Sequence, residues 1–213
     1  LAQLSDLRFG ACLADDMGLG KTIQVIAALL HHADRGLWED RPALLICPTS
    51  VLGNWERELN KFAPSLNVLR HHGRGRASTL ADLDRSKEPN QVVLTTYVIA
   101  RMDVDLLAKR RWSHLIIDEA QNIKNPRAQQ AVAVRRIPGD RRYALTGTPV
   151  ENRLTELWSI LEFCNVGMLG TLAEFQRRFS LPIERFGDAS ARETLRRLVQ
   201  PFIMRRVKTD PNV

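Results

Sequence analysis

The chain has 213 residues, of which 44% are hydrophobic, and its formal net charge is +7. This length suits one substantial hydrophobic core with at most a small appended subdomain, and the apolar fraction is ordinary for a globular protein. The apolar runs fall short of the ~20 residues that span a bilayer, and no signal peptide opens the chain. The positive charge is mostly arginine, which is compatible with a solvated basic surface or with a phosphate-rich partner such as nucleic acid.

Short apolar runs alternate with segments of helical periodicity through most of the chain. Residues 1–10 have the pattern of a helix end and a turn, and we expect further sequence before them. Strands are expected in the runs 11–14, 43–47, 67–70, 92–95, 114–117 and 142–146. Helices are expected at 23–32, at 49–63, from residue 97 onwards and at 126–136. Residues 71–90 are expected to form a loop with room for one helix. This alternation predicts a parallel sheet covered on both faces, with ligands at the carboxyl ends of its strands.

From Leu154 onwards the pattern changes to helices alone. Leu157, Trp158 and Leu161 continue a helical spacing, and further helices are expected around Phe175 and over 190–199. The next strand-like run is 202–204. We therefore expect a main α/β lobe over 1–153, a helical subdomain over 154–200 and a closing segment over 201–213.

The cysteines and histidines lack the spacing of a metal site or a disulfide framework. Cys12 and Cys47 lie in apolar runs, so we expect both to be core residues in a protein kept in a reducing compartment. All five histidines, including the pairs His31-His32 and His71-His72, are expected at the surface.

A glycine-rich loop stands between the first strand and the first long helix. It reads Asp15-Asp16-Met17-Gly18-Leu19-Gly20-Lys21-Thr22. Backbone N–H groups of such a loop, together with the positive end of the helix, hold phosphates. Lys21 would reach the β and γ phosphates and the Thr22 hydroxyl would bind Mg²⁺. Asp15 occupies a position where the common consensus has glycine, so a purely structural turn is the alternative.

A pair of carboxylates follows the strand expected at 114–117. Asp118 at the strand tip would hold Mg²⁺ through water, and Glu119 would polarise the attacking water as general base. The alternative is two exposed carboxylates at the start of a helix. Because the phosphate loop precedes this pair in the same α/β pattern, nucleotide hydrolysis is the stronger hypothesis.

The two motifs together resemble motifs one and two of the Swi/Snf-type ATPases of helicase superfamily two, in which Asp15 is the usual residue. Four further stretches are similar to the family's later motifs: 48–56, 94–97, 145–152 and 201–208. The resemblance spans nearly the whole chain. It implies the RecA-like first lobe of a DNA-dependent ATPase that moves along double-stranded DNA and remodels or displaces bound proteins.

The resemblance also implies roles for individual residues. Nucleotide contacts are expected from Asp16, Met17, Gly18, Leu19, Gly20, Lys21 and Thr22. Mg²⁺ is expected on Thr22 and Asp118, and catalysis involves Lys21, Glu119 and Gln121, the last sensing the γ-phosphate. Thr146, Gly147 and Thr148 would couple the nucleotide state to DNA. Contacts to the DNA backbone are expected from Thr49, Ser50, Asn54, Thr96 and Lys124.

Some of these residues have simpler interpretations. Ser50 and Thr96 could cap helices instead. Trp55 is expected in the core, because it shares a helical face with Leu59 and Phe62.

The resemblance implies ATP and Mg²⁺ as cofactors, and double-stranded DNA and a second lobe of the same parent chain as partners. We expect a monomer without a membrane partner, in the cytoplasm or on the nucleoid, or in the nucleus of a eukaryote. Hydrolysis by this chain alone should be slow, because the second lobe supplies the arginine finger in this family. A strand-separating or RNA helicase and a non-catalytic nucleotide switch are the competing functions.

Overall fold

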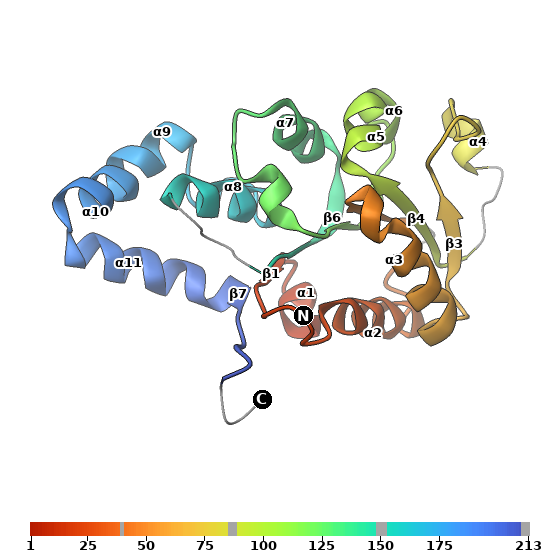
Figure 1. The fold of residues 1–213 in the computed structure, drawn as a ribbon, viewed down its shortest axis with the longest axis horizontal. Coiled ribbons are helices and arrows are strands. Elements are labelled where there is room, and N and C mark those ends of the chain that lie inside the picture. Colours follow the sequence, from red (N-terminus) through yellow and green to blue (C-terminus); the bar gives the residue numbers. More distant parts are fainter. Residues whose placement is uncertain (39–40, 85–88, 148–152, 210–213) are drawn as a thin grey trace.

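The computed structural model describes residues 1–38, 41–84, 89–147 and 153–209 (Figure 1). Within them one seven-stranded sheet has the order β3-β4-β2-β5-β6-β1-β7, and every neighbouring pair is parallel. The strands are β1 (Ala11–Leu13), β2 (Ala43–Cys47), β3 (Asn67–Arg70), β4 (Gln91–Thr96), β5 (Trp112–Ile117), β6 (Gly139–Leu145) and β7 (Ile203–Met204). The expected α/β fold is confirmed.

Helices cover both faces of the sheet (Figure 1). One face carries α1 (Ala2–Asp6), α2 (Lys21–Asp34) and α3 (Thr49–Phe62). The other carries α5 (Tyr97–Met102), α6 (Val104–Leu107), the 3₁₀ turn η1 (Ala120–Ile123), α7 (Gln129–Arg136) and α8 (Leu154–Cys164). The short α4 (Leu80–Asp84) lies in the segment expected to be mostly loop.

The central strands are buried on both faces, which explains their continuous apolar runs. Every residue of β2, β4 and β5 is buried. Cys12 and Cys47 are core residues as expected, and burial raises the pKa of each thiol to about 12. Trp55 and Leu59 are also buried, but Phe62 is 46% exposed because α3 ends there.

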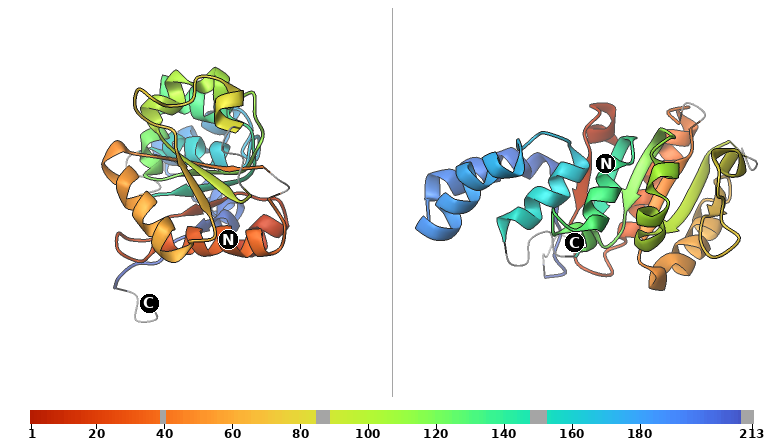
Figure 2. Two further views of the ribbon diagram at one scale, coloured as in Figure 1. Left: turned by 90° about the vertical axis from the view of Figure 1, so that its right-hand side faces the viewer. Right: turned by 90° about the horizontal axis from the view of Figure 1, so that it is seen from above.

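A helical arm extends from the β7 end of the sheet (Figure 2). It consists of α8, α9 (Leu172–Phe175), the π turn η2 (Gln176–Ser180), α10 (Leu181–Phe186) and α11 (Ala189–Val199), followed by the turn η3 (Gln200–Phe202). Phe175, Phe179 and Leu195 form a core of their own with Leu161 of α8. The opposite side of α8 packs on the sheet through Ile160 and Phe163 and their neighbours. The division of the chain at residues 154 and 201 remains a prediction.

The expectation that all histidines lie at the surface is wrong for three of them, because His32, His71 and His114 are buried. His32 and His114 stack with ring centroids 5.0 Å apart, and their ring nitrogens Nδ1 and Nε2 lie 2.8 Å apart. Burial lowers the pKa of His32 to about 4 and that of His114 well below its usual value. Both rings are therefore neutral at physiological pH and pack like aromatic residues.

Candidate nucleotide and DNA site

The sheet order brings three motif-bearing strands together. Strand β6 lies between β5 and β1, with Ala144 opposite Ile117 on one side and opposite Cys12 on the other. The loops that follow β1, β5 and β6 therefore leave the sheet at the same edge. Parallel sheets bind ligands at this carboxyl edge.

The phosphate loop connects β1 to α2. Gly18 and Gly20 have φ angles of 86° and 73°, a left-handed conformation that side chains disfavour. Helix α2 begins at Lys21, directly after the loop. The Lys21 ammonium donates to the main-chain oxygens of Asp15 and Asp16, at 2.6 and 3.2 Å. The loop therefore presents the helix amino end and a lysine at one point, as phosphate binding requires.

Asp15, the departure from the common consensus, is fully buried beneath the loop. Its carboxylate accepts hydrogen bonds from the backbone N–H of Arg206 at 2.8 Å, from the Arg206 guanidinium Nε at 3.1 Å and from Gln24 at 3.2 Å. Burial alone would raise the pKa of Asp15, but the hydrogen bonds from Arg206 and Gln24 outweigh it and hold that pKa below its usual value. Asp15 is therefore an ionised anchor.

This anchor ties the phosphate loop to a segment far away in the sequence, residues 203–208, which we call the strap. The Asp16 N–H donates to the Arg206 carbonyl at 3.1 Å, and the Lys208 N–H donates to the Asp16 carboxylate at 3.1 Å. The strap begins as β7, which pairs with β1. The Lys208 side chain lies so close to Gly18 that a Cβ on that glycine would be 3.5 Å from its ammonium.

Asp118 lies at the tip of β5 and is partly buried. One carboxylate oxygen accepts from the indole N–H of Trp55 at 2.8 Å and the other from the Glu119 N–H at 2.9 Å. Burial raises the pKa of Asp118, and these two hydrogen bonds and the positive charge of Lys21 oppose the rise. A nearby cation would therefore stabilise its charged form.

Glu119 has a left-handed backbone, with φ 52° and ψ 57°. Non-glycine residues adopt this conformation at a cost, and such strain gathers at functional sites. The buried Tyr97 hydroxyl donates to the Asp118 carbonyl at 2.7 Å and thereby braces this turn. The Glu119 side chain accepts from the Gln121 amide at 2.6 Å.

Gln121 links the catalytic glutamate candidate to β6. Its amide oxygen accepts from the Thr146 hydroxyl at 3.0 Å, and the Thr146 N–H donates to the Leu13 carbonyl at 2.9 Å. Gly147 lies against Met17 of the phosphate loop, since a Cβ on this glycine would be 3.9 Å from the Met17 Cγ. These contacts join residues expected to couple nucleotide and DNA, but Thr148 is outside the described residues.

Residues expected to contact DNA surround this edge. Thr49 and Ser50 are exposed in the first turn of α3, directly after β2. Asn54 is exposed on the same helix and bonds to Glu58 at 2.7 Å and to Arg57 at 3.2 Å. Lys124 is partly buried at the end of η1.

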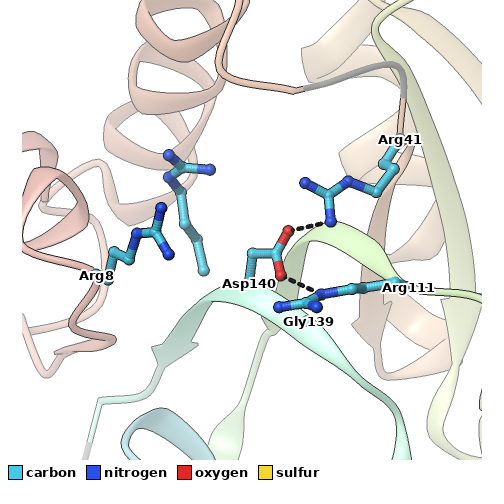
Figure 3. Close-up of a pocket in the computed structure, with 6 residues that line it drawn as sticks. Arg8, Arg41, Arg111, Gly139 and Asp140 are labelled. Carbon is cyan, nitrogen blue, oxygen red and sulfur yellow. Dashed lines mark hydrogen bonds and ion pairs between the residues drawn. The ribbon is translucent and has the colours of Figure 1, made fainter.

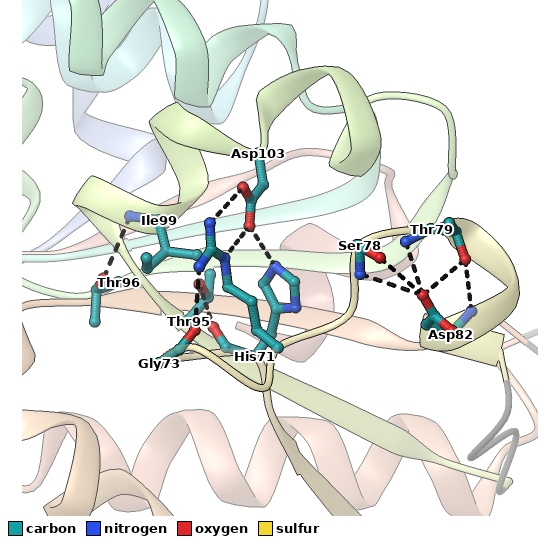
Figure 4. Close-up of polar contacts among 10 residues, drawn as sticks. His71, Gly73, Ser78, Thr79, Asp82, Thr95, Thr96, Ile99 and Asp103 are labelled. Carbon is teal, nitrogen blue, oxygen red and sulfur yellow. Dashed lines mark hydrogen bonds and ion pairs between the residues drawn. The ribbon is translucent and has the colours of Figure 1, made fainter.

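Thr96 differs from this group, because its side chain is buried and caps α5 by accepting from the Ile99 N–H at 3.4 Å (Figure 4). The capping role is therefore the one that the structure supports. At the other end of α5, Asp103 pairs with the buried His71 at 2.9 Å (Figure 4). Asp103 also pairs with Arg76 at 2.6 Å. Burial lowers the pKa of His71, against the effect of Asp103.

Sequence reasoning did not identify three contributors to the site: the Arg206 partner of Asp15, the Trp55 indole N–H and the Tyr97 hydroxyl. Arg206 lies 191 positions from Asp15, so no local spacing connects the two. Trp55 fits its expected core role, and its packing hides the hydrogen bond. The signal for Tyr97 was its place directly after a buried strand, at the carboxyl edge.

Comparison with protein families gives a match over residues 1–212 to the SNF2-related domain. The chain belongs to the SNF2-related domain family. It is 49% identical over 210 residues to YwqA of Bacillus subtilis, which is named for a proposed ATP-dependent helicase/translocase activity, and covers 23% of it. It is 40% identical over 231 residues to helicase SWR1 of Cryptococcus neoformans and covers 18% of it. The chain therefore spans about a fifth of these relatives.

Two solved structures of this family show the same fold. The SWI2/SNF2 ATPase core of Sulfolobus solfataricus in complex with double-stranded DNA is 44% identical, with a TM-score of 0.87 over all of this chain and 43% of that one. The core domain from the same organism gives 43% identity and a TM-score of 0.85, with 99% of this chain and 42% of that one covered. No helix in the described parts of this SNF2-related domain is both long and apolar enough to cross a membrane.

Proposed function

We propose that this chain is the ATP-binding lobe of a double-stranded DNA translocase that remodels or displaces DNA-bound proteins. The observation that carries the proposal is the convergence of the phosphate loop, the Asp118-Glu119 pair and Thr146 at one sheet edge, joined through Gln121. The DNA-bound Sulfolobus solfataricus core supports double-stranded DNA as the partner.

The residues have distinct tasks in this proposal. Backbone N–H groups of residues 16–22 and the Lys21 ammonium bind the ATP phosphates. Glu119 takes the proton of the attacking water, and Gln121 reports the γ-phosphate to Thr146. Mg²⁺ would be held by Thr22 and Asp118. Their side chains offer oxygen ligands, and Mg²⁺ is usually bound by one or two protein oxygens together with substrate phosphates. When bound, the ion would neutralise charge that develops on the phosphates.

The proposed DNA contacts are those of the exposed Thr49, Ser50 and Asn54 and of Lys124. They lie after β2 and β5, at the edge where the nucleotide binds. Thr96 is omitted because its buried hydroxyl caps a helix. Translocation further requires the remainder of the parent protein, with the second lobe as the proposed partner.

The test is the ATPase rate of the native protein with duplex DNA, single-stranded DNA, RNA or no nucleic acid. Duplex DNA should stimulate most. Greater stimulation by single strands or RNA would favour a strand-separating or RNA helicase, and nucleotide binding without turnover would favour a non-catalytic switch.

Lys21→Ala should abolish nucleotide binding and leave the fold intact, because the loop's N–H groups cannot replace a charged contact to phosphate. Lys109 is exposed and lies outside the sequence motifs, so Lys109→Ala is the matched control and should bind nucleotide normally. Binding can be followed with a fluorescent ATP analogue and folding by circular dichroism. Tight Mg-ATP binding by folded Lys21→Ala protein would refute the assignment of the loop.

A further inference from the structure

Four neighbouring strands carry an arginine at or just before their amino ends, on the edge of the sheet opposite the nucleotide loops. The arginines are Arg41 before β2, Arg111 before β5, Arg141 as the third residue of β6 and Arg8 before β1. All four line one cavity of about 360 Å³ with Gly139 and Asp140 (Figure 3). Because the strands are parallel, their amino ends lie together at one edge of the sheet and bring these arginines close to one another. Their carboxyl ends lie together at the opposite edge, where the sequence motifs are.

Arginines dominate the described lining of the cavity. Asp140 is the carboxylate in its lining, and it already pairs with Arg41 at 2.7 Å and with Arg111 at 2.5 Å (Figure 3). Arg8 makes no ion pair with any residue that the structure describes, although it lines the same cavity. Among the residues that the structure describes, one carboxylate thus faces four guanidinium groups, which leaves this part of the lining positively charged.

Arg141 carries a donor that the protein does not satisfy. Its Nη1 donates to the Leu37 carbonyl at 3.1 Å, but its Nε is buried and has no hydrogen-bond partner within the described ranges. Buried donors are nearly always paired, so such a group indicates an acceptor that lies outside the described residues. The positive charge of Arg141 also adds to burial in lowering the pKa of the nearby His32 and His114.

The backbone of Arg8 ends helix α1 and leads the chain toward β1. Its φ is 60°, and the following Phe9 N–H donates to the Leu4 carbonyl at 2.8 Å, the arrangement of a helix that closes with a left-handed residue. This helix end fixes the position of Arg8 at the cavity.

We propose that this cavity is a second phosphate-binding site, distinct from the nucleotide loop, in which Arg8 and Arg141 bind a phosphate group beside the Asp140 ion pairs. Several guanidinium forks suit a phosphate group better than a single carboxylate, because its oxygens can accept from more than one fork. The phosphate belongs either to a small phosphate compound or to a nucleic-acid backbone. The site does not depend on the function proposed above.

The experiment titrates pyrophosphate into Lys21→Ala protein by calorimetry, so that the nucleotide loop does not contribute. Binding should weaken roughly fivefold in Arg8→Gln and strengthen roughly fivefold in Asp140→Asn, because one unit charge at short range changes affinity by this order. A general loss of stability would weaken pyrophosphate binding in both variants, so opposite changes in affinity would exclude that explanation. Arg136→Gln removes an exposed arginine that pairs with Asp105 and does not line the cavity, so it should change nothing.

Two further arms complete the test. Competition by a short duplex for the pyrophosphate site would identify the phosphate as nucleic acid, and a lack of competition would identify a small phosphate compound. Should Arg8→Gln disturb the fold, Arg111→Gln, whose side chain is 69% exposed, gives the same prediction. Absence of pyrophosphate binding in Lys21→Ala protein, or binding unchanged by Arg8→Gln and Asp140→Asn, would overturn the proposal.

Discussion

At the scale of single residues, Asp15 connects the phosphate loop to the strap. It is fully buried and binds both the backbone and the guanidinium of Arg206. A glycine at this position would leave the Arg206 guanidinium without its partner. The residue that departs from the general phosphate-loop consensus therefore has a physical role in this fold.

We predict that Asp15→Asn and Arg206→Gln each lower the free energy of unfolding by about 1.5–3 kcal/mol, the range for a hydrogen bond to a charged group. Because Arg206 is 43% exposed, the larger cost of breaking a fully buried pair should not be reached. The double variant should lose less than the two single losses combined. Arg205→Gln, at an exposed neighbour, is the control, and chemical denaturation is the measurement.

The same pair predicts a pH dependence. The pKa of Asp15 is lowered in the folded protein, so its stabilisation is present above the unfolded pKa of about 3.9 and is lost as pH falls through the folded pKa. Stability of the wild-type protein should therefore fall below about pH 4 more steeply than that of Asp15→Asn. Equal slopes in acid denaturation would contradict this.

Trp55 supports Asp118 through one hydrogen bond. We predict that Trp55→Phe keeps most of the packing but raises the pKa of Asp118 further, because one donor to the ionised carboxylate is lost. The acidic limb of Mg²⁺-dependent nucleotide binding should then move to higher pH. Trp112→Phe removes another buried indole N–H, bonded to the Leu107 carbonyl, and should leave that limb unchanged.

At the scale of elements, the amino end of α3 and the η1 turn bear the proposed DNA contacts. We predict weak, sequence-independent binding to duplex DNA through phosphates. Affinity should fall with salt with a log–log slope of about −0.9 per phosphate contacted. Lys124→Ala should weaken binding for all sequences alike and reduce the slope by about one.

Lys109→Ala is the control for the DNA measurement, and fluorescence anisotropy over a salt series is the method. Affinity indifferent to salt, or strong selection among DNA sequences, would contradict a backbone-reading surface.

At the scale of the whole molecule, the strap and the nucleotide loop are one hydrogen-bonded unit. The described end of the chain is thus hydrogen-bonded to the proposed phosphate loop. We expect nucleotide binding to slow amide exchange in β7, because loop and strap are joined through Asp15 and Asp16.

We predict that residues 1–213 alone hydrolyse ATP slowly and without stimulation by DNA. The phosphate loop and Lys21 approach the γ-phosphate from one side, and an arginine finger on the other side is typically worth about 10³–10⁵ in rate. The chain covers 43% of the Sulfolobus solfataricus core, so the finger is proposed to come from the remainder of such a core. Robust DNA-stimulated turnover by the 213-residue chain would place the finger in the helical arm.

By itself the sequence determined the parallel α/β fold and the place of the proposed phosphate loop between β1 and α2. These signals are local: buried parallel strands need apolar runs, and a phosphate loop needs its glycines and lysine in consecutive positions. For the same reason Asp118 and Glu119 could be found at the end of a strand.

Only the tertiary structure decided the contacts between distant segments. The Asp15–Arg206 pair, the Thr146–Gln121–Glu119 chain and the buried histidine pair depend on strand order, which local periodicity does not encode. Thr96 illustrates the limit at a single residue. Its sequence context allowed both a DNA contact and a helix cap, and burial supports the cap because a hydroxyl inside the protein must satisfy a local donor.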